Sequence, residues 1–462
     1  MLDILPNFEW IKNSNLVVLL RNRLDFEKYN FLTLDVNILS KIEKNFQEQK
    51  NTTLKIYTWN KNFEEIIFLF YLDTKKDLVL FLWENIWLIP EKFSFEYDKD
   101  NILLDSLILW KYYFSTYKSE KKDLEINIVC DVNYEHFLQD RLSTLKNITD
   151  ARDLVNTPSN DKTCDKYVRH IKNIYFKNTK VKVIDYDELK RLGLGLIEAV
   201  WRASTSKPKL VILERILDKK LPTIWLVWKW IVFDTGWLNI KTESYMYWMK
   251  DDMAWSASLL YTMKELDEKT LNCNIVCALA IAENSIAWDA YRPWDIIKSY
   301  SWKTVEVMNT DAEWRLVLAD WISYISKNYK LDSITTVATL TWACMVALGY
   351  NYAWIMWNNK ELINNLLNNS TFEKYWELPF NDYYIEKSKW SISDYKNLTE
   401  WIFVWSTMWW AFLSNFCLNW EKFAHIDIAW VSFVKEKYWL YNVWATWFWV
   451  DSLSKIILDV NK

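Results

Sequence analysis

The stretch Asn309-Thr310-Asp311-Ala312-Glu313-Trp314-Arg315-Leu316 is a short polar segment between two apolar-rich ones, Thr304–Met308 and Val317–Ile322. Two carboxylates and a guanidinium recur in it at every second position. In an extended segment, side chains two residues apart leave on the same face, so we expect Asp311, Glu313 and Arg315 to converge on one point. The pattern favours a metal-binding or anion-binding site, although an isolated pattern of this kind is more often a solvated strand end with an ion pair.

A second polar cluster, between Leu226 and Ser256, strengthens the interpretation as a site. It supplies Lys229, Asp234, Lys241 and Asp252. Strand and helix signals alternate from this point to the C-terminus, which indicates an α/β fold with a mixed or parallel sheet covered on both faces. In such sheets, binding sites form at strand ends, where Lys229 and Asp234 are expected to lie.

Both clusters resemble the signature segments of the leucyl aminopeptidases, or cytosol aminopeptidases, a family of two-metal cytosolic exopeptidases. One departure is systematic, because tryptophan usually stands where the family has glycine. Trp237 follows Gly236, and Trp314 separates Glu313 from Arg315. Further segments resemble the family in the same order: 151–160, 199–204, 292–295, 301–307, 339–343, 425–430 and 444–450. The resemblance is strong over residues 151–455 and weak before them.

The tryptophan content is the most unusual feature of the composition. The chain has 32 tryptophans and 4 glycines among 462 residues, whereas a globular protein of this length should have roughly 7% glycine, or about 32 residues. We hypothesise that the source organism decodes UGA as glycine, so that glycine positions are written as tryptophan. An indole cannot adopt a positive φ at low cost or let the backbone approach a ligand closely. Trp376 is an exception, since the family commonly has a true tryptophan there.

The resemblance implies a site for two divalent metal ions, manganese or zinc. Lys229, Asp234, Asp252 and Glu313 would hold the tighter ion, with Lys229 as a neutral amine. Asp234, Asp311 and Glu313 would hold the second, more exchangeable ion. Ions bridged in this way lie about 3.5–4 Å apart, close enough to share a hydroxide that attacks the scissile carbonyl. Carboxylate oxygens are hard ligands and suit these metals.

The same resemblance gives roles to residues around the metals. Lys241 would stabilise the tetrahedral oxyanion as an ammonium group, and Arg315 would hold a bicarbonate that serves as the general base. The substrate-binding residues would be Met249, Thr339 and Leu340, with backbone amides near Leu340 also facing the bicarbonate. The simpler alternatives are a surface lysine for Lys241 and a core position for Met249.

The three histidines are expected to be structural. His136, His170 and His425 lie too far from the acids in the sequence to suggest a histidine-rich zinc site. Only His425 lies inside a segment that resembles the family.

We expect two domains. Residues 1–145 alternate β-rich runs with amphipathic segments, which predicts a small N-terminal α/β domain for assembly or substrate access. Residues 146–462 are expected to form a larger αβα catalytic domain with a mixed central sheet. The uncharged run Ile334–Trp357 is predicted to be strand, loop and helix start, and not a membrane span.

Charge and cysteine usage indicate the compartment and the partners. The formal net charge of −4 gives no reason to expect nucleic acid or a membrane as the main partner. The six cysteines are scattered, which favours reduced thiols in a cytoplasmic protein. The first residues lack the basic and apolar regions of a signal peptide.

The leading prediction is a metal-dependent aminopeptidase that hydrolyses the N-terminal residue from peptides, with a leucine-like preference. The family forms hexamers, so the resemblance implies a homo-hexamer. Two alternatives stay open. One is a DNA-binding accessory protein of the same fold, which the acidic net charge does not support. The other is a non-catalytic scaffold, against which the complete set of implied ligands argues.

Overall fold

The structure is a computed structural model. It describes residues 2–8, 11, 14–29, 32, 34–57, 63–73, 78–97, 101–121, 124–202, 204, 206–330, 332–338, 347–349, 352–358, 360, 364, 374–379, 381–398, 405–419, 422–428, 431–434, 443–446 and 450–459. The chain divides into two compact units, Met1–Thr149 and Asp150–Lys462, and each is described by itself.

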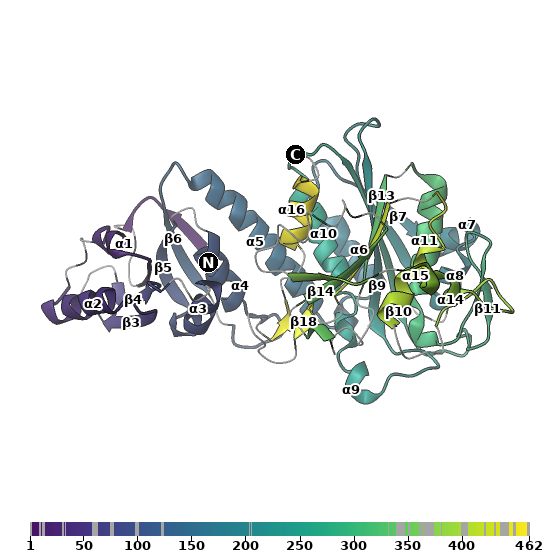
Figure 1. Cartoon of the computed structure of the whole chain (residues 1–462), viewed down its shortest axis with the longest axis horizontal. Coiled ribbons are helices and arrows are strands. Elements are labelled where there is room, and N and C mark those ends of the chain that lie inside the picture. The colour runs from purple at the N-terminus through teal and green to yellow at the C-terminus, as the bar shows by residue number, and fades with distance from the viewer. Residues whose placement is uncertain are drawn as a thin grey trace. The chain divides into compact units, whose positions relative to one another are not determined.

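The N-terminal unit contains a six-stranded sheet in the order β1-β6-β5-β2-β4-β3 (Figure 1). All neighbouring strands are parallel except β3 and β4. The strands are β1 (Leu2–Leu5), β2 (Ser14–Leu20), β3 (Thr52–Tyr57), β4 (Phe63–Phe70), β5 (Lys92–Tyr97) and β6 (Glu125–Cys130). The helices are α1 (Arg23–Glu27), α2 (Val36–Glu48), α3 (Leu78–Asn85) and α4 (Asn101–Lys111), and α5 (Glu135–Asn156) follows them.

The C-terminal unit is built on an eight-stranded sheet in the order β15-β14-β17-β13-β9-β10-β8-β7. Its centre is parallel, because β9 pairs in parallel with both β10 and β13. By contrast, β8 pairs antiparallel with β10 and β7, and β14 pairs antiparallel with β17 but parallel with β15. The strands are β7 (Lys180–Asp185), β8 (Lys209–Arg215), β9 (Thr223–Asp234), β10 (Asn274–Asn284), β13 (Ser333–Ala338), β14 (Tyr352–Trp357), β15 (Lys374–Glu377) and β17 (Lys422–Asp427).

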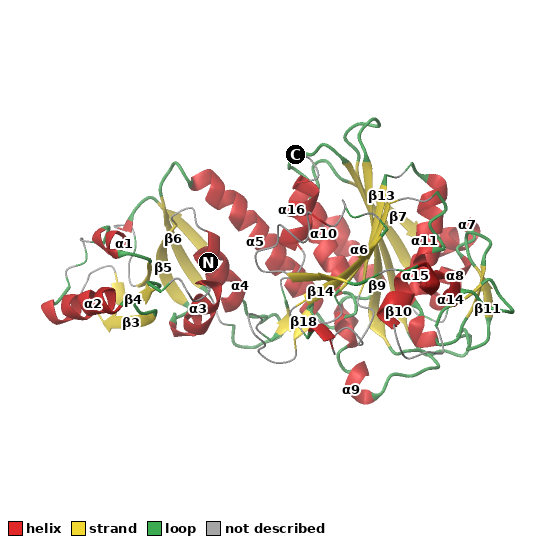
Figure 2. Ribbon diagram, in the orientation of Figure 1, coloured by secondary structure: helices red, strands yellow, loops and turns green. Residues whose placement is uncertain are grey.

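Helices cover both faces of this sheet (Figure 2). One face carries α6 (Cys164–Asn173), α10 (Ala254–Leu266) and α16 (Val450–Asp459), and the other carries α8 (Gly195–Trp201), α11 (Trp314–Asn328) and α15 (Trp405–Ser414). Burial on both faces explains why the central strands are apolar almost throughout. The expected αβα arrangement with a mixed sheet is confirmed.

Shorter elements complete the C-terminal unit. They are the 3₁₀ helices η3 (Ser159–Asp161), η4 (Met249–Asp251) and η5 (Thr310–Ala312), the helices α7 (Tyr186–Leu192), α9 (Glu243–Met246) and α14 (Asp382–Ser388), and the strands β11 (Ile296–Lys298), β12 (Thr304–Glu306), β16 (Tyr395–Lys396), β18 (Phe433–Val434) and β19 (Trp444–Ala445).

Local sequence signals fix several boundaries. α5 ends at Asn156, immediately before Thr-Pro, as the restriction on residues preceding proline predicts. α7 ends at Leu192, and the C-cap Gly193 adopts a left-handed φ of 79°, which terminates the helix without a Cβ penalty. The uncharged run Ile334–Trp357 contributes β13 and β14 in its described parts. No helix among the described residues is long and apolar enough to cross a membrane.

The prediction of an extended segment at 309–316 is wrong. Thr310–Ala312 form the 3₁₀ helix η5 and α11 begins at Trp314. The side chain of Asn309 accepts a hydrogen bond of 2.7 Å from the backbone N–H of Asp311, which turns the chain as an N-cap does.

Candidate metal centre

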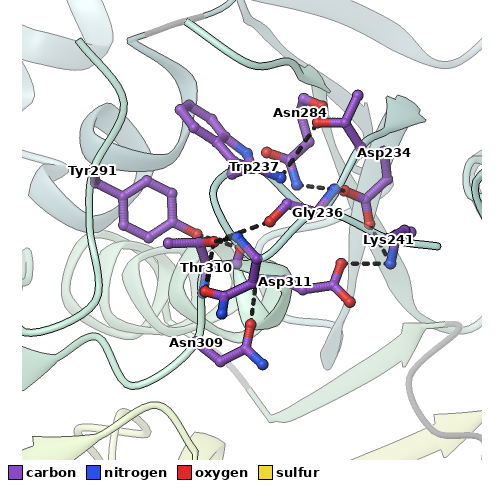
Figure 3. Close-up of polar contacts among 11 residues, drawn as sticks. Asp234, Gly236, Trp237, Lys241, Asn284, Tyr291, Asn309, Thr310 and Asp311 are labelled. Carbon is purple, nitrogen blue, oxygen red and sulfur yellow. Dashed lines mark hydrogen bonds and ion pairs between the residues drawn. The ribbon is translucent and has the colours of Figure 1, made fainter. Parts of the chain in front are cut away.

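The candidate site lies where β9 and β10 end, beside the turn η5 (Figure 3). Between Ile231 and Asp234, β9 advances three residues, while β10 advances only two, from Ala282 to Asn284. The extra residue in β9 is a bulge, a feature that re-aims side chains next to functional sites. It places Asp234 opposite Asn284. Lys229 lies in β9 in register with Ala280, and its side chain is outside what the structure describes.

Three buried carboxylates from separate parts of the chain meet at this place. Asp234 ends β9, Asp252 follows η4, and Glu313 is the N-cap of α11. They are 2%, 8% and 0% exposed. One oxygen from each lies within 4.8 Å of the others. Burial of three mutually repelling carboxylates is costly unless cations balance them.

Lys241 lies beside Asp234 and Asp311 (Figure 3). Its Nζ lies 3.1 Å from Oδ2 of Asp234 and 2.5 Å from Oδ1 of the half-buried Asp311. Burial alone would lower the pKa of Lys241, but the carboxylates of Asp234, Asp311 and Glu313 outweigh burial and raise the pKa above its ordinary value. Lys241 is therefore held as an ammonium group.

The residues present fit divalent metal ions. Asp234, Asp252, Asp311 and Glu313 supply four carboxylates, and Lys241 balances only part of their charge. Carboxylate oxygens are the ligands that Mg²⁺ and Mn²⁺ prefer and that Zn²⁺ accepts.

Arg315 is buried close to this cluster, since burial lowers its pKa and the carboxylates of Glu313 and Asp311 partly offset that effect. It lies in the first turn of α11, where a guanidinium N–H donates to the carbonyl oxygen of Asn397. Its Cζ lies 2.7 Å from the ring centroid of Trp409 and 4.7 Å from that of Trp314. Because Thr310–Ala312 and the residues from Trp314 onward are helical, the expected convergence of Arg315 with Asp311 and Glu313 cannot arise from an extended segment, and it stays a prediction.

The remaining predicted residues are only partly described. Met249 begins η4 and is half-buried. Thr339 and Leu340 lie outside the described residues. His425 is fully buried, its Nδ1 lies 2.8 Å from Oγ1 of Thr336, and burial lowers its pKa to about 3. His425 is therefore neutral and held within the sheet.

Sequence reasoning missed a set of polar residues that brace the site. Asn284 donates from its amide to Oδ1 of Asp234, and Tyr291 donates from its hydroxyl to the carbonyl oxygen of Thr310 at 2.7 Å. Asn239 exchanges hydrogen bonds with Thr310. Asp234 was predicted because it is a polar residue at the end of an apolar strand. Asn284 ends the apolar strand β10 in the same way and could have been recognised by this pattern.

Comparison with known proteins identifies the family. The model described as "Cytosol aminopeptidase family, catalytic domain" matches residues 149–453. A protein of Rickettsia canadensis named "Probable cytosol aminopeptidase" is 33% identical over 374 residues, which make up 78% of this chain and 75% of the relative. A protein of Pseudomonas fluorescens with the same name is 35% identical over 384 residues, 79% of this chain and 75% of the relative.

Two solved structures share the fold. The cytosol aminopeptidase from Coxiella burnetii superposes with a TM-score of 0.83 at 24% identity, covering 100% of this chain and 99% of the other. The bottromycin maturation enzyme BotP in complex with Mn gives a TM-score of 0.83 at 21% identity, covering 97% and 100%. Because the family model matches more than half of the chain and these curated relatives align with most of it, the chain belongs to the cytosol aminopeptidase family and is a metal-dependent aminopeptidase.

Proposed function

We propose that this enzyme removes leucine-like N-terminal residues from peptides at the site of Asp234, Asp252 and Glu313. The observation that carries the proposal is the group of three buried carboxylates whose ligand oxygens lie within 4.8 Å of one another. In the proposed assignment, Lys229, Asp234, Asp252 and Glu313 hold one divalent ion. Asp234, Asp311 and Glu313 hold the other.

The bound ions, manganese or zinc, would supply Lewis acidity that activates water and polarises the scissile carbonyl. The chain's own residues would stabilise the oxyanion and bind the substrate. Lys241, kept protonated by Asp234 and Asp311, would donate a hydrogen bond to the oxyanion that develops on the substrate. Met249, Thr339 and Leu340 are proposed to contact the substrate's N-terminal residue.

We propose that Arg315 binds the bicarbonate that acts as general base. Its Nε has no hydrogen-bond partner among the described residues. The ring centroid of Trp409 lies 2.7 Å from the guanidinium carbon, so the indole covers one face of the guanidinium. Glycine at 314 and 409 would free the space over the guanidinium that a small anion needs.

Glycine in place of tryptophan is also supported by backbone geometry. The described non-glycine residues with a left-handed φ are Gln49 at 47°, Trp237 at 57°, Trp294 at 77° and Trp302 at 72°. A bulky residue in this region is a genuine outlier. We therefore propose that the native protein has glycine at 237, 294 and 302.

Buried indole N–H groups without a hydrogen-bond partner also support glycine at tryptophan positions. Buried tryptophans normally find a partner for the indole N–H, and leaving such a group unpaired costs about 1–3 kcal/mol. Among the described residues, the following buried indole N–H groups have no hydrogen-bond partner: Trp83, Trp201, Trp225, Trp237, Trp321, Trp354 and Trp409.

We further propose a cytoplasmic homo-hexamer in which residues 1–145 serve assembly or substrate access. The buried free thiols of Cys130, Cys164, Cys273 and Cys277 are consistent with a reducing compartment. The hexamer rests on the family resemblance.

The test is hydrolysis of leucine-p-nitroanilide by protein with glycine at the family positions, with Mn²⁺ or Zn²⁺ added and a chelator control. We expect metal-dependent release that Glu313→Ala abolishes and Glu214→Ala, outside the cluster, does not. Bound metal without release under any condition would favour the non-catalytic or DNA-binding alternative, which a salt-sensitive gel shift would then separate.

A further inference from the structure

Asp234 has two chemically different oxygens in this structure (Figure 3). Its Oδ1 accepts the Asn284 amide and, at 2.9 Å, the backbone N–H of Gly236. Its Oδ2 faces Lys241, with Nζ 3.1 Å away. One oxygen is therefore occupied by two neutral donors, and the other is turned toward the cation side of the site.

Asn284 is built into the turn that carries Asp234. Its backbone carbonyl accepts from the N–H of Thr235 at 3.0 Å and from the Thr235 hydroxyl at 2.9 Å. The bulge in β9 sets Asp234 opposite Asn284, and Asn284 is 0% exposed. The amide therefore has little freedom to point elsewhere.

The orientation of the Asn284 amide follows from the group that it faces. A carboxylate only accepts hydrogen bonds, so the amide nitrogen must face Asp234. The amide oxygen of Asn284 then has no hydrogen-bond partner among the described residues. Burying such an oxygen without a partner is costly, so Asn284 is poorly suited to a purely structural role.

Asn274, at the other end of β10, shows what a structural asparagine looks like. It is 2% exposed. Its amide oxygen accepts from the N–H of Leu217 at 2.8 Å, and its amide nitrogen donates to the carbonyls of Asp218 at 2.7 Å and Leu221 at 3.1 Å. Both amide atoms are satisfied there, in contrast to Asn284.

We propose that Asn284 is a positioning residue that holds Asp234 so that it binds metal through Oδ2 alone. The amide and the Gly236 N–H fix the plane of the carboxylate and fill Oδ1. Oδ2, which faces Lys241, is then the oxygen turned toward the place where the cations would bind. The inference rests on the proposed assignment of Asp234 as a metal ligand. Removing a partner that orients a metal ligand typically weakens metal affinity about 10–100-fold.

The experiment compares full-length wild type with Asn284→Leu, Asn284→Ala and the matched control Asn274→Leu. Each protein is stripped with chelator, and its Mn²⁺ dissociation constant is measured by isothermal titration calorimetry, alongside the melting temperature of the metal-free protein. We expect both Asn284 variants to bind Mn²⁺ about 10–100-fold more weakly. Asn274→Leu should keep wild-type affinity while losing at least as much thermal stability as Asn284→Leu.

Two results would overturn the inference, and they differ from each other. Wild-type Mn²⁺ affinity in Asn284→Ala, which adds no bulk and keeps the test open if the leucine variant does not fold, would show that the amide does not position the ligand. Failure of the wild-type protein to bind Mn²⁺ at all would defeat the proposed metal assignment, and the inference with it.

Discussion

Thr310 and Asn239 hold each other by reciprocal hydrogen bonds. The backbone N–H of Asn239 donates to the Thr310 hydroxyl at 3.0 Å, and the backbone N–H of Thr310 donates to the Asn239 amide oxygen at 2.9 Å. The hydroxyl also lies 2.9 Å from the carbonyl oxygen of Gly236. These bonds join the loop between Asp234 and Lys241 to the turn that carries Asp311, so the two halves of the site are braced through Thr310.

Thr310→Val is expected to loosen this brace while keeping the side chain's shape. The Asn239 N–H would lose its acceptor, which should cost about 1–3 kcal/mol of unfolding free energy. Mn²⁺ affinity should fall because Asp311 is no longer held in place beside Lys241. Chemical denaturation and metal titration measure the two effects. Thr310→Ser keeps the hydroxyl and should retain most of the stability and most of the Mn²⁺ affinity. Equal losses in the serine and valine variants would show that the Thr310 hydroxyl does not brace the site.

Gly236 is expected to tolerate no side chain. Its φ is 79°, and a Cβ would lie 2.5 Å from the carbonyl oxygen of Asn239 and 3.1 Å from Oδ1 of Asp311. Gly193 has the same φ, but nothing lies within 4 Å of its Cβ position. Gly193→Ala should therefore cost only the left-handed backbone penalty of about 1–2 kcal/mol.

Gly236→Ala should cost more than Gly193→Ala, because the backbone at Asn239 must move as well. Gly236→Ala should also weaken Mn²⁺ binding, because the backbone N–H of residue 236 donates to Asp234 and would move with the backbone. Denaturation curves and metal titrations of the two variants check this. Indistinguishable stability would show that the loop yields easily and that close approach at Gly236 is unimportant.

Lys162 is a buried amine that ties the end of α5 to the turn before Asp252. Its Nζ donates to the carbonyls of Val155 at 2.9 Å and Lys250 at 2.8 Å, and it is 2% exposed. Lys162→Met fills the same space but leaves these carbonyls without their donor. We expect a loss of about 1–3 kcal/mol in unfolding free energy, measured at pH 7 in the metal-free protein.

The effect of Lys162→Met should depend on pH. Burial lowers the pKa of Lys162 well below its ordinary value, while the unfolded chain keeps a lysine pKa of about 10.4. Between these two pKa values the unfolded state binds more protons, so the lysine's contribution to stability rises with pH through this window. The difference between wild type and Lys162→Met should therefore grow from neutral pH toward about pH 10. A constant or shrinking difference would mean that the amine stays charged in the folded protein.

Sequence motifs predicted the family and the αβα fold, and both are confirmed. The apolar strand ending at Asp234 and the paired acids Asp311 and Glu313 can be recognised locally, because residue type and strand position are encoded in a few neighbouring residues. The conformation around Asp311 was predicted wrongly, since the N-cap formed by Asn309 outweighs the extended pattern.

The bracing residues could not be predicted in this way. Asn284 lies 50 positions from its partner Asp234, and Asn239 lies 71 positions from Thr310. Asparagine and threonine also occur widely in turns for local reasons. Their partners become visible only when the sheet and its bulge bring the strand ends together.

The hypothesis of glycine at the tryptophan positions predicts a specific gain in stability. Trp294 is 72% exposed with a φ of 77°, so its ring buries little, whereas its backbone is strained. Trp294→Gly should remove strain of about 1–3 kcal/mol. Trp288, 95% exposed and without a left-handed φ, is the matched control, and Trp288→Gly should give no gain because glycine only adds chain entropy to the unfolded state. Peptide mass spectra of the native protein are the direct measurement and should show glycine at 237, 294 and 302. Tryptophan in those native peptides would refute the hypothesis, whatever the stability of the variants.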